Sequence, residues 1–418
     1  MSGQTIRAVI GKGFGDEGKG LAVDHFCRLA PDTLVIKHNG GAQAGHTVEP
    51  DGKRFVFHQL SSGSFRHCDT FWADSYYPDL YKLREEMEAF QTVSGFPVQV
   101  YCDAKTQATI IDDVLINMLL ESLRGKNRHG SCGMGINECD LRTKAGFGVS
   151  VLDFLSKDAK TLTERMLEIR ENYVKKRVWT ALREMADGGV LLDLARDVQA
   201  QEYLECLQSK TVIENAVEEM QRSAEHFVKV VEDAGALLRG RESIVFETGQ
   251  GLLLDGENKE FAPHVSASRT GLYHPVRICR EHGLSLSEVV YVTRTYVTRH
   301  GAGPLPNECT RESLGITQED ATNVENPWQG SIRYARHGSL EKFLKPVLED
   351  LRELGGEQVS TSLFLTHLNE TDHRVMMRDW DPHATALCQA DSFRQVFDRC
   401  YFSADRDAKE TLVYELME

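Results

Sequence analysis

The chain has 418 residues, of which 41% are hydrophobic and 27% charged, as in a globular protein with a large buried core. Its formal net charge of −15 argues against general binding of nucleic acid or of a membrane surface. We find no apolar run near the ~20 residues of a membrane span, and we expect no export signal. The ten cysteines form no C-x-x-C pair, so we expect reduced thiols in a cytoplasmic protein.

Short apolar runs and longer runs with helical apolar spacing alternate along the chain. The predicted strands are 6–10, 33–37, 55–60, 97–101, 243–247, 288–296 and 359–365. The predicted helices are 21–29, 77–90, 109–124 and 340–354. This alternation predicts an α/β fold with a large, mostly parallel central sheet, flanking helices and a P-loop-like phosphate site.

Residues 153–239 differ from the rest, because apolar residues recur there every three or four positions and no strand pattern interrupts them. We therefore expect a helical insertion. It forms a sub-domain within a single α/β domain that spans residues 1–418, since we find no internal repeat and no low-complexity linker.

The first predicted strand runs into a glycine-rich turn, Gly11–Gly20, which we call the phosphate loop. Glycine backbone N–H groups and the N-terminus of the following helix both attract an anion. The loop fits the spacing G-x-x-x-x-G-K, but Gly20 stands where a P-loop has Ser or Thr for magnesium. Asp16 and Glu17 place two carboxylates where phosphate is expected, which indicates a metal or a proton transfer. The structural alternative is a turn with solvated charges.

Further glycine-rich or polar loops lie at 38–47, 128–137, 248–251, 299–304 and 366–369. Ligands of open α/β sheets bind at the carboxyl ends of the strands, so these loops predict one large site. Cys132 lies in such a loop, and we expect it to line the site because no histidine partner is identifiable for a nucleophile.

Four segments resemble signature motifs of the adenylosuccinate synthetase family and occur in the family's order over nearly the whole chain. They are Gly15–Gly20, Gly40–Thr47, Phe246–Asp255 and Thr298–Pro306. The second has Gln43 where the family usually has asparagine. One glycine-rich loop is weak evidence for a family, whereas four ordered motifs are specific.

The resemblance implies a ligase that converts IMP, L-aspartate and GTP to adenylosuccinate, GDP and phosphate in AMP biosynthesis, with Mg²⁺ as cofactor. It implies that Asp16 removes the N1 proton of IMP while the 6-oxygen attacks the γ-phosphate, and that His46 is the supporting acid. Lys19 can stabilise the developing charge, and Asp16 can ligate magnesium in place of the absent hydroxyl. The family also implies a cytoplasmic homodimer.

The binding residues implied by the resemblance differ by ligand. For the triphosphate they are Gly15, Asp16, Glu17, Gly18, Lys19, Gly20, Gly45, His46 and Thr47, with Asp16 and Gly45 as magnesium ligands. For IMP they are Ser131, Cys132, Gln250 and Ser266; for aspartate, Ser331, Arg333 and Arg336; for the base of the triphosphate, His367 and Asn369. The structural alternatives are a helix cap (Asp16), a turn histidine (His46), a loop amide (Gln250) and solvated charges (Arg333, Arg336).

The predicted IMP-phosphate loop departs from the family. Cys132 and Met134 replace a threonine and an arginine. Gly146 stands where the family has an arginine that reaches into the partner subunit. Arg142 or Lys144 is the nearby candidate for that role.

Two further departures from the family concern the residues predicted to bind aspartate and the base of the triphosphate. Tyr334 and Ala335 replace two arginines of the aspartate loop. Asn369 replaces the aspartate that reads guanine; it offers one acceptor and one donor, and so can pair with adenine. The sequence leaves open GTP or ATP as donor, a paralogue that acts on a guanylate, and a catalytically impaired nucleotide-binding regulator. Asp16, which the guanylate branch tends to replace, argues against that paralogue.

Overall fold

The structure, a computed structural model, describes residues 3–125, 131–190, 197–317 and 330–416. Parts of the predicted loop 128–137 and helical block 153–239, namely 128–130 and 191–196, lie outside the described residues. Among the described helices, none combines the length and apolar character needed to cross a bilayer.

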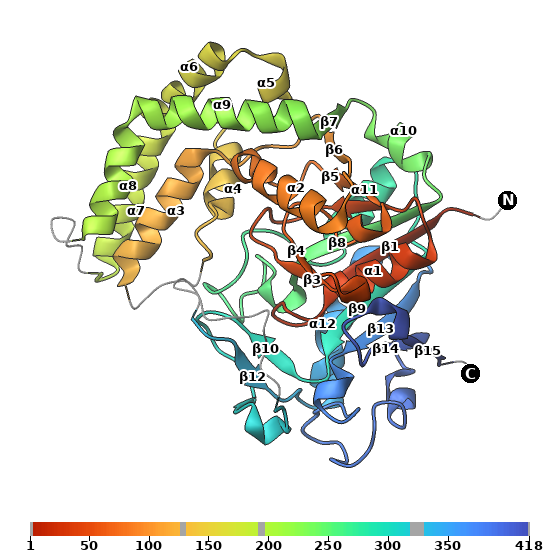
Figure 1. Cartoon of the computed structure of the whole chain (residues 1–418). Coiled ribbons are helices and arrows are strands. Elements are labelled where there is room, and N and C mark those ends of the chain that lie inside the picture. The colour runs from red at the N-terminus through yellow and green to blue at the C-terminus, as the bar shows by residue number, and fades with distance from the viewer. Residues whose placement is uncertain (1–2, 126–130, 191–196, 318–329, 417–418) are drawn as a thin grey trace.

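The centre of the fold is one ten-stranded sheet in the described part of the chain (Figure 1). Its strands are β1 (Thr5–Gly11), β2 (Leu34–Lys37), β5 (Asp69–Trp72), β6 (Val100–Asp103), β7 (Val228–Val231), β8 (Ser243–Gly251), β9 (Glu288–Arg294), β13 (Ser360–Thr366), β14 (Arg399–Phe402) and β15 (Leu412–Glu415). Their order is β15-β14-β13-β9-β1-β8-β2-β5-β6-β7. Every neighbouring pair is parallel except β14 and β15. The predicted α/β fold with a mostly parallel sheet is confirmed.

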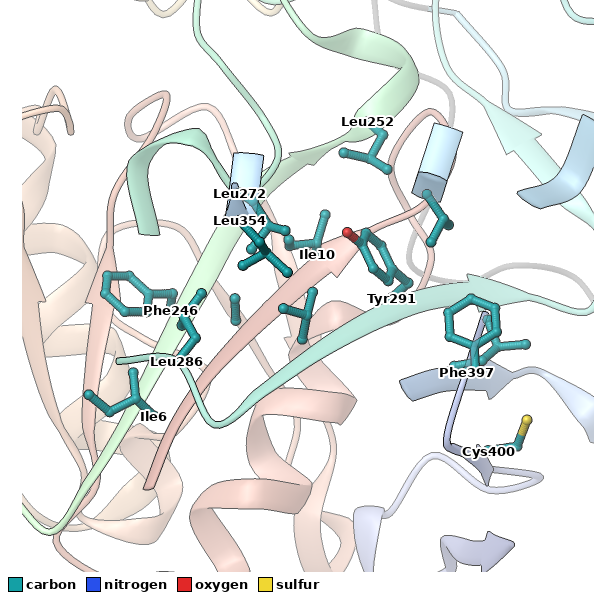
Figure 2. Packing of buried hydrophobic residues seen from close by; sticks show 14 of the residues in the cluster. Ile6, Ile10, Phe246, Leu252, Leu272, Leu286, Tyr291, Leu354, Phe397 and Cys400 are labelled. Atoms are coloured by element: carbon teal, nitrogen blue, oxygen red, sulfur yellow. The ribbon is translucent and has the colours of Figure 1, made fainter. Parts of the chain in front are cut away.

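Both faces of the central strands are buried, because side chains alternate between them. On β1, Ile6 and Ile10 belong to the larger core cluster, which Figure 2 shows with Tyr291 of the neighbouring strand β9. Val9 points to the opposite face and packs with Phe26 of helix α1 (Lys19–Leu29). Helices α11 (Tyr273–Glu281) and α12 (Leu340–Asp350) contribute to the larger cluster.

A group of helices extends from the β5–β6–β7 edge of the sheet, at the upper left of Figure 1. They are α2 (Leu80–Ser94), α3 (Ile111–Arg124), α4 (Ile136–Lys144), α5 (Val151–Ser156), α6 (Ala159–Ile169), α7 (Lys175–Asp187), α8 (Val198–Gln208) and α9 (Lys210–Phe227). Trp72 and Cys102 of the sheet share one apolar cluster with all of these helices except α4. The helices are thus packed onto the sheet, and the division into domains stays a prediction.

The prediction of an uninterrupted helical block up to residue 239 is wrong. The helical run stops at Phe227, and Val228–Val231 form the edge strand β7 beside β6. The reason is local: three valines within four residues favour extended backbone. Helix α10 (Ala234–Arg239) follows.

Smaller differences concern one predicted strand and several strands that were not predicted. The predicted strand 55–60 shortens to β4 (Phe55–Phe57), which pairs antiparallel with β3 (His46–Val48) apart from the main sheet. A second small sheet combines β10 (Val297–Arg299), β11 (Glu308–Cys309) and β12 (Arg333–Ala335). Both small sheets carry segments that resemble family motifs.

A buried ion pair fixes helix α4 against α3. Arg142 is 0% exposed, and its guanidinium donates to both carboxylate oxygens of Asp113 and to the carbonyl oxygens of Ala108 and Phe147. An arginine held in this way cannot reach into a partner subunit, so Arg142 is excluded from that role. Lys144 is exposed and pairs with Asp140 on the same helix.

We predict that Asp113→Ala lowers the free energy of unfolding by about 3–5 kcal/mol, because it leaves the Arg142 charge buried without its partner. Urea unfolding followed by circular dichroism measures the change. Lys144→Ala is the control and costs about 0–1 kcal/mol, since its pair with Asp140 is solvated. Equal losses in the two variants would contradict the assignment.

Candidate active site

The phosphate loop, at the carboxyl end of β1, touches the ends of two other strands, β8 and β13. The carbonyl oxygen of Gly13 accepts a hydrogen bond from Leu253 N at 3.0 Å. A Cβ at Gly251 would lie 2.2 Å from that same oxygen, so only glycine allows this approach. From the end of β13, Thr366 Oγ1 donates to the carbonyl oxygen of Glu17 at 2.8 Å. The phosphate loop therefore meets two of the predicted loops, 248–251 and 366–369.

Glu17 turns inward and ties the phosphate loop together. Its carboxylate accepts hydrogen bonds from Gly13 N at 2.9 Å and Gly15 N at 2.8 Å, and it pairs with Lys19 Nζ at 2.8 Å. Burial opposes its ionisation, but Lys19 and these two amides outweigh burial and hold the pKa of Glu17 below its ordinary value. The Glu17 carboxylate thus occupies two of the backbone amides of the loop.

Asp16 has the opposite orientation. Its side chain is 26% exposed, and Oδ2 lies 3.6 Å from Nε2 of His300. Its backbone is left-handed, with a φ of 58°. The loop therefore presents one carboxylate outward and keeps the other inside.

His46 lies over the start of α1. A Cβ at Gly20 would come within 3.2 Å of the Cβ of His46. Its Nδ1 lies 2.5 Å from Oε1 of Glu247. The other oxygen of this carboxylate, Oε2, accepts a hydrogen bond from the Ser62 backbone N and lies 3.7 Å from Lys37 Nζ. At 2.5 Å the carboxylate accepts a hydrogen bond from Nδ1–H, which leaves Nε2 of the neutral ring as an acceptor. Burial lowers the pKa of His46 despite the attraction of Glu247.

Three buried polar atoms near the phosphate loop have no hydrogen-bond partner among the described residues: Gln43 Oε1, His46 Nε2 and Thr47 Oγ1. All three come from the loop between β2 and the end of β3. Buried polar atoms are normally satisfied, so a cluster of open ones fits a polar ligand such as a nucleotide.

The residues present also fit magnesium. This ion is commonly bound by one or two carboxylates together with phosphate oxygens and water. Asp16 offers an accessible carboxylate, and the backbone of Gly45 is exposed beside His46. The described residues contain no group of three or more acidic, histidine or cysteine side chains that could hold a metal alone.

Of the predicted IMP residues, Gln250 lies beside the Gly40–Gly41 turn. Gln250 Oε1 would lie 3.0 Å from a Cβ at Gly40, and it accepts from Asn39 at 3.4 Å. On the other side, a Cβ at Gly41 would meet Ile136, which follows the Ser131–Gly135 segment.

The side chains of that segment are held locally. Ser131 Oγ donates to Asn117 of α3 at 2.9 Å. Burial raises the pKa of the Cys132 thiol to about 11, which keeps it protonated and fits a lining role. Ser266 Oγ contacts Ser268 Oγ at 3.2 Å.

The two arginines of the predicted aspartate loop do not converge. Arg333 donates to the carbonyl oxygens of Gly301 and Gly303, at 3.1 and 2.7 Å, and so lies beside the His300 segment. Arg336 instead donates to Ser313 O at 2.6 Å. Ser331 is exposed. Arg333 therefore contacts the segment that carries His300, and His300 in turn lies 3.6 Å from Asp16.

The predicted base-reading residues follow β13. His367 has a left-handed φ of 60° and its Nδ1 lies 2.8 Å from Thr366 Oγ1. Asn369 is exposed in the turn Leu368–Glu370. The segment that begins at Ser403 lies alongside, because Leu368 N donates to Ser403 O at 3.2 Å.

Sequence reasoning gave no role to three residues that the structure brings to the site: Glu247, Arg294 and His300. A signal existed for two of them, because Glu247 and Arg294 are charged residues at the ends of apolar strands, where burial demands a partner. His300 lay inside a recognised motif. Its position beside Asp16 depends on the packing of β9 and β10, which the sequence alone does not reveal.

Similarity to known proteins identifies the family of the chain. The sequence model described as adenylosuccinate synthetase matches residues 8–327. The chain belongs to the adenylosuccinate synthetase family. The match ends before Arg333, His367 and Asn369.

Curated adenylosuccinate synthetases are distant relatives. That of Microcystis aeruginosa is 28% identical over 310 residues, which are 73% of this chain and 62% of the relative. That of Chlorobium phaeovibrioides is 28% identical over 335 residues, 75% of this chain and 68% of the relative. The match thus spans about three fifths to two thirds of these proteins.

Two solved structures share the fold. Fully ligated adenylosuccinate synthetase from Plasmodium falciparum has a TM-score of 0.62 at 18% identity and covers 88% of this chain and 77% of its own. Succinoaminodeoxyadenylate synthetase of cyanophage S-2L, bound to dGMP and to dATP as an energy donor, has a TM-score of 0.58 at 16% identity. It covers 99% of this chain and 96% of its own.

The buried Glu247 predicts a pH dependence of stability. Burial opposes its ionisation, but Lys37, His46 and Ser62 outweigh burial, so the folded-state pKa of Glu247 lies well below its ordinary value of 4.5. The stabilisation is fully present above the unfolded pKa and is lost as pH falls toward the folded pKa. Glu247→Gln should therefore lose about 3 kcal/mol at pH 7 and lose less additional stability between pH 5.5 and pH 4 than the native protein.

Urea unfolding at pH 7, 5.5 and 4 measures this difference. Glu242→Gln serves as the control, because Glu242 is exposed just before β8. A Glu247→Gln variant with native stability at pH 7 would show that this carboxylate is not held by its neighbours.

Proposed function

We propose that this chain is a ligase that forms adenylosuccinate, GDP and phosphate from IMP, L-aspartate and GTP through a 6-phosphoryl-IMP intermediate. The proposal is supported by the position of Asp16 and Lys19 in the phosphate loop and of His46 over Gly20 at the start of α1, in a member of this family. The open polar atoms of the Gln43–Thr47 loop support a nucleotide there.

In the first step, the outward carboxylate of Asp16 accepts the N1 proton of IMP. The electron pair moves to the 6-oxygen, which attacks the γ-phosphorus, and GDP leaves. Nε2 of His46 faces the transferred group, whose negative charge opposes the effect of burial and favours the imidazolium backed by Glu247. Magnesium, when bound, neutralises phosphate charge beside Asp16 and Gly45.

In the second step, the uncharged amine of aspartate attacks C6 and the C6–O bond breaks. Phosphate leaves with the oxygen and takes up the proton that the amine releases. The purine oxygen is a good leaving group only because it has been phosphorylated. We assign recognition of the aspartate carboxylates first to Arg333, whose contacts with Gly301 and Gly303 hold it next to the His300 segment.

A second candidate is the same chemistry with ATP as donor or with a guanylate as acceptor. Asn369 favours ATP, because an amide can both donate to and accept from adenine, whereas a carboxylate only accepts. The succinoaminodeoxyadenylate synthetase that shares this fold was solved with dGMP and dATP, and its full length corresponds to this chain. Asp16 keeps IMP as the preferred acceptor in this proposal. Homodimerisation remains an expectation from the family.

The direct test is product formation by the purified protein with IMP or dGMP, aspartate, Mg²⁺, and GTP or ATP. We expect a succinylated purine and one phosphate per turnover. Asp16→Asn should lower kcat by about 10²–10⁴-fold, because the base is lost while the left-handed turn is kept.

Asp32→Asn is the matched control, since Asp32 is an exposed aspartate with a φ of 68° and should leave kcat unchanged. Native turnover of Asp16→Asn would exclude it as the base. Absence of product from the native protein with every substrate pair would favour the regulator over the enzyme.

Asn369→Asp tests how the triphosphate is chosen. We expect the ratio of kcat/KM for GTP to kcat/KM for ATP to rise about tenfold or more, because a carboxylate accepts two hydrogen bonds from guanine. Asn215→Asp, on the exposed surface of α9, controls for the added charge. An unchanged ratio would show that Asn369 does not contact the base.

A further inference from the structure

The backbone of Asp16 is held from the neighbouring strand. A left-handed φ of 58° is uncommon for a residue with a Cβ. Aspartate tolerates it, as exposed Asp32 with a φ of 68° shows, so support from outside selects this conformation at Asp16 rather than making it possible. That support comes from Arg294, the last residue of β9, whose Nε donates to the carbonyl oxygen of Asp16 at 2.5 Å. Arg294 is 4% exposed, and its own carbonyl oxygen lies 3.0 Å from Nε2 of the buried His337.

Arg294 is in turn oriented by a tyrosine and a carboxylate. Its Nη1 donates to the hydroxyl oxygen of Tyr296 at 2.8 Å, and the Tyr296 hydroxyl donates to the carboxylate of Glu370. Burial raises the pKa of Tyr296, so the hydroxyl keeps the proton that it donates. A positive and a negative charge thus stand at the two ends of a buried hydrogen-bonded chain.

The far end of this chain lies in the segment assigned to the base of the triphosphate. Glu370 closes the turn Leu368–Glu370 and follows Asn369 directly. The same strand end makes a second contact with the phosphate loop, from Thr366 Oγ1 to the carbonyl oxygen of Glu17. Two consecutive loop carbonyls, those of Asp16 and Glu17, are therefore fixed from β9 and β13, which lie side by side in Figure 1.

We propose that Arg294, Tyr296 and Glu370 are positioning residues that hold Asp16 in its left-handed conformation, with its carboxylate directed to the acceptor purine. The role of Asp16 as base rests on the proposed function; the restraint on its backbone does not. A base must lie within hydrogen-bond reach of the proton it removes, so a looser backbone lowers the fraction of productive complexes.

Tyr296→Phe is the decisive variant, because it removes one hydroxyl and keeps the ring. Tyr291→Phe is its matched control. Tyr291 is also a fully buried tyrosine reached from β9, and its hydroxyl donates to Asp350 at 2.8 Å, away from the phosphate loop. The two variants should lose similar thermal stability, and only Tyr296→Phe should affect Asp16.

Two measurements separate positioning from general destabilisation. In the assay above, kcat of Tyr296→Phe should fall about tenfold, with the KM values for all three substrates within about twofold of native. In native-state hydrogen exchange, the amides of residues 13–20 should exchange faster in Tyr296→Phe and at the native rate in Tyr291→Phe.

Glu370 variants test the end of the chain. Glu370→Gln keeps an oxygen that accepts from the Tyr296 hydroxyl and should retain most of the native kcat, whereas Glu370→Leu should match Tyr296→Phe. The double variant Tyr296→Phe/Glu370→Leu should be no slower than either single variant, because both break one chain.

The outcomes distinguish the two proposals. Native exchange of residues 13–20 in Tyr296→Phe overturns the positioning chain whether or not the protein is active. If residues 13–20 exchange faster in Tyr296→Phe but the native protein forms no product, the restraint on Asp16 is retained and the proposed ligase is overturned. Equal loss of kcat in Tyr296→Phe and Tyr291→Phe would also overturn the positioning role.

Discussion

The phosphate loop depends on one buried carboxylate. Glu17 gathers two loop amides and Lys19 around itself and so ties the loop together. In this form Gly251, at the end of β8, packs directly on Gly13. From there the sheet brings Glu247, Arg294 and Thr366 to the same edge.

Charge is distributed around this edge by burial and pairing. Glu247 is fully buried yet ionised, since Lys37, His46 and Ser62 contact it. Its partner His46 is directed by that contact, with one ring nitrogen committed to Glu247 and the other left to meet a ligand. Asp350, by contrast, lies buried beside Tyr291, and burial raises its pKa to about 7. Carboxylates of the same chain therefore differ in charge according to their neighbours.

Local sequence patterns predicted the parts of the fold that are governed by local physics. The run Ile6–Ile10, the glycine turn and helix α1 all follow from apolar periodicity and turn chemistry. The edge strand β7 was missed because helical spacing on both sides masked its valines. Contacts such as Asp16 with His300, or the separation of Arg333 from Arg336, are set by which strands become neighbours, and one sequence does not contain that order.

The two adjacent acids of the phosphate loop looked contradictory in the sequence, because both stand where phosphate is expected. The backbone separates them. Glycines at 15 and 18 and the left-handed Asp16 turn successive side chains to opposite sides, so that Glu17 enters the loop and Asp16 leaves it. One carboxylate then serves the structure and the other stays available for chemistry. From outside the loop, the Arg294 guanidinium contacts the carbonyl oxygen of Asp16 and so favours this arrangement.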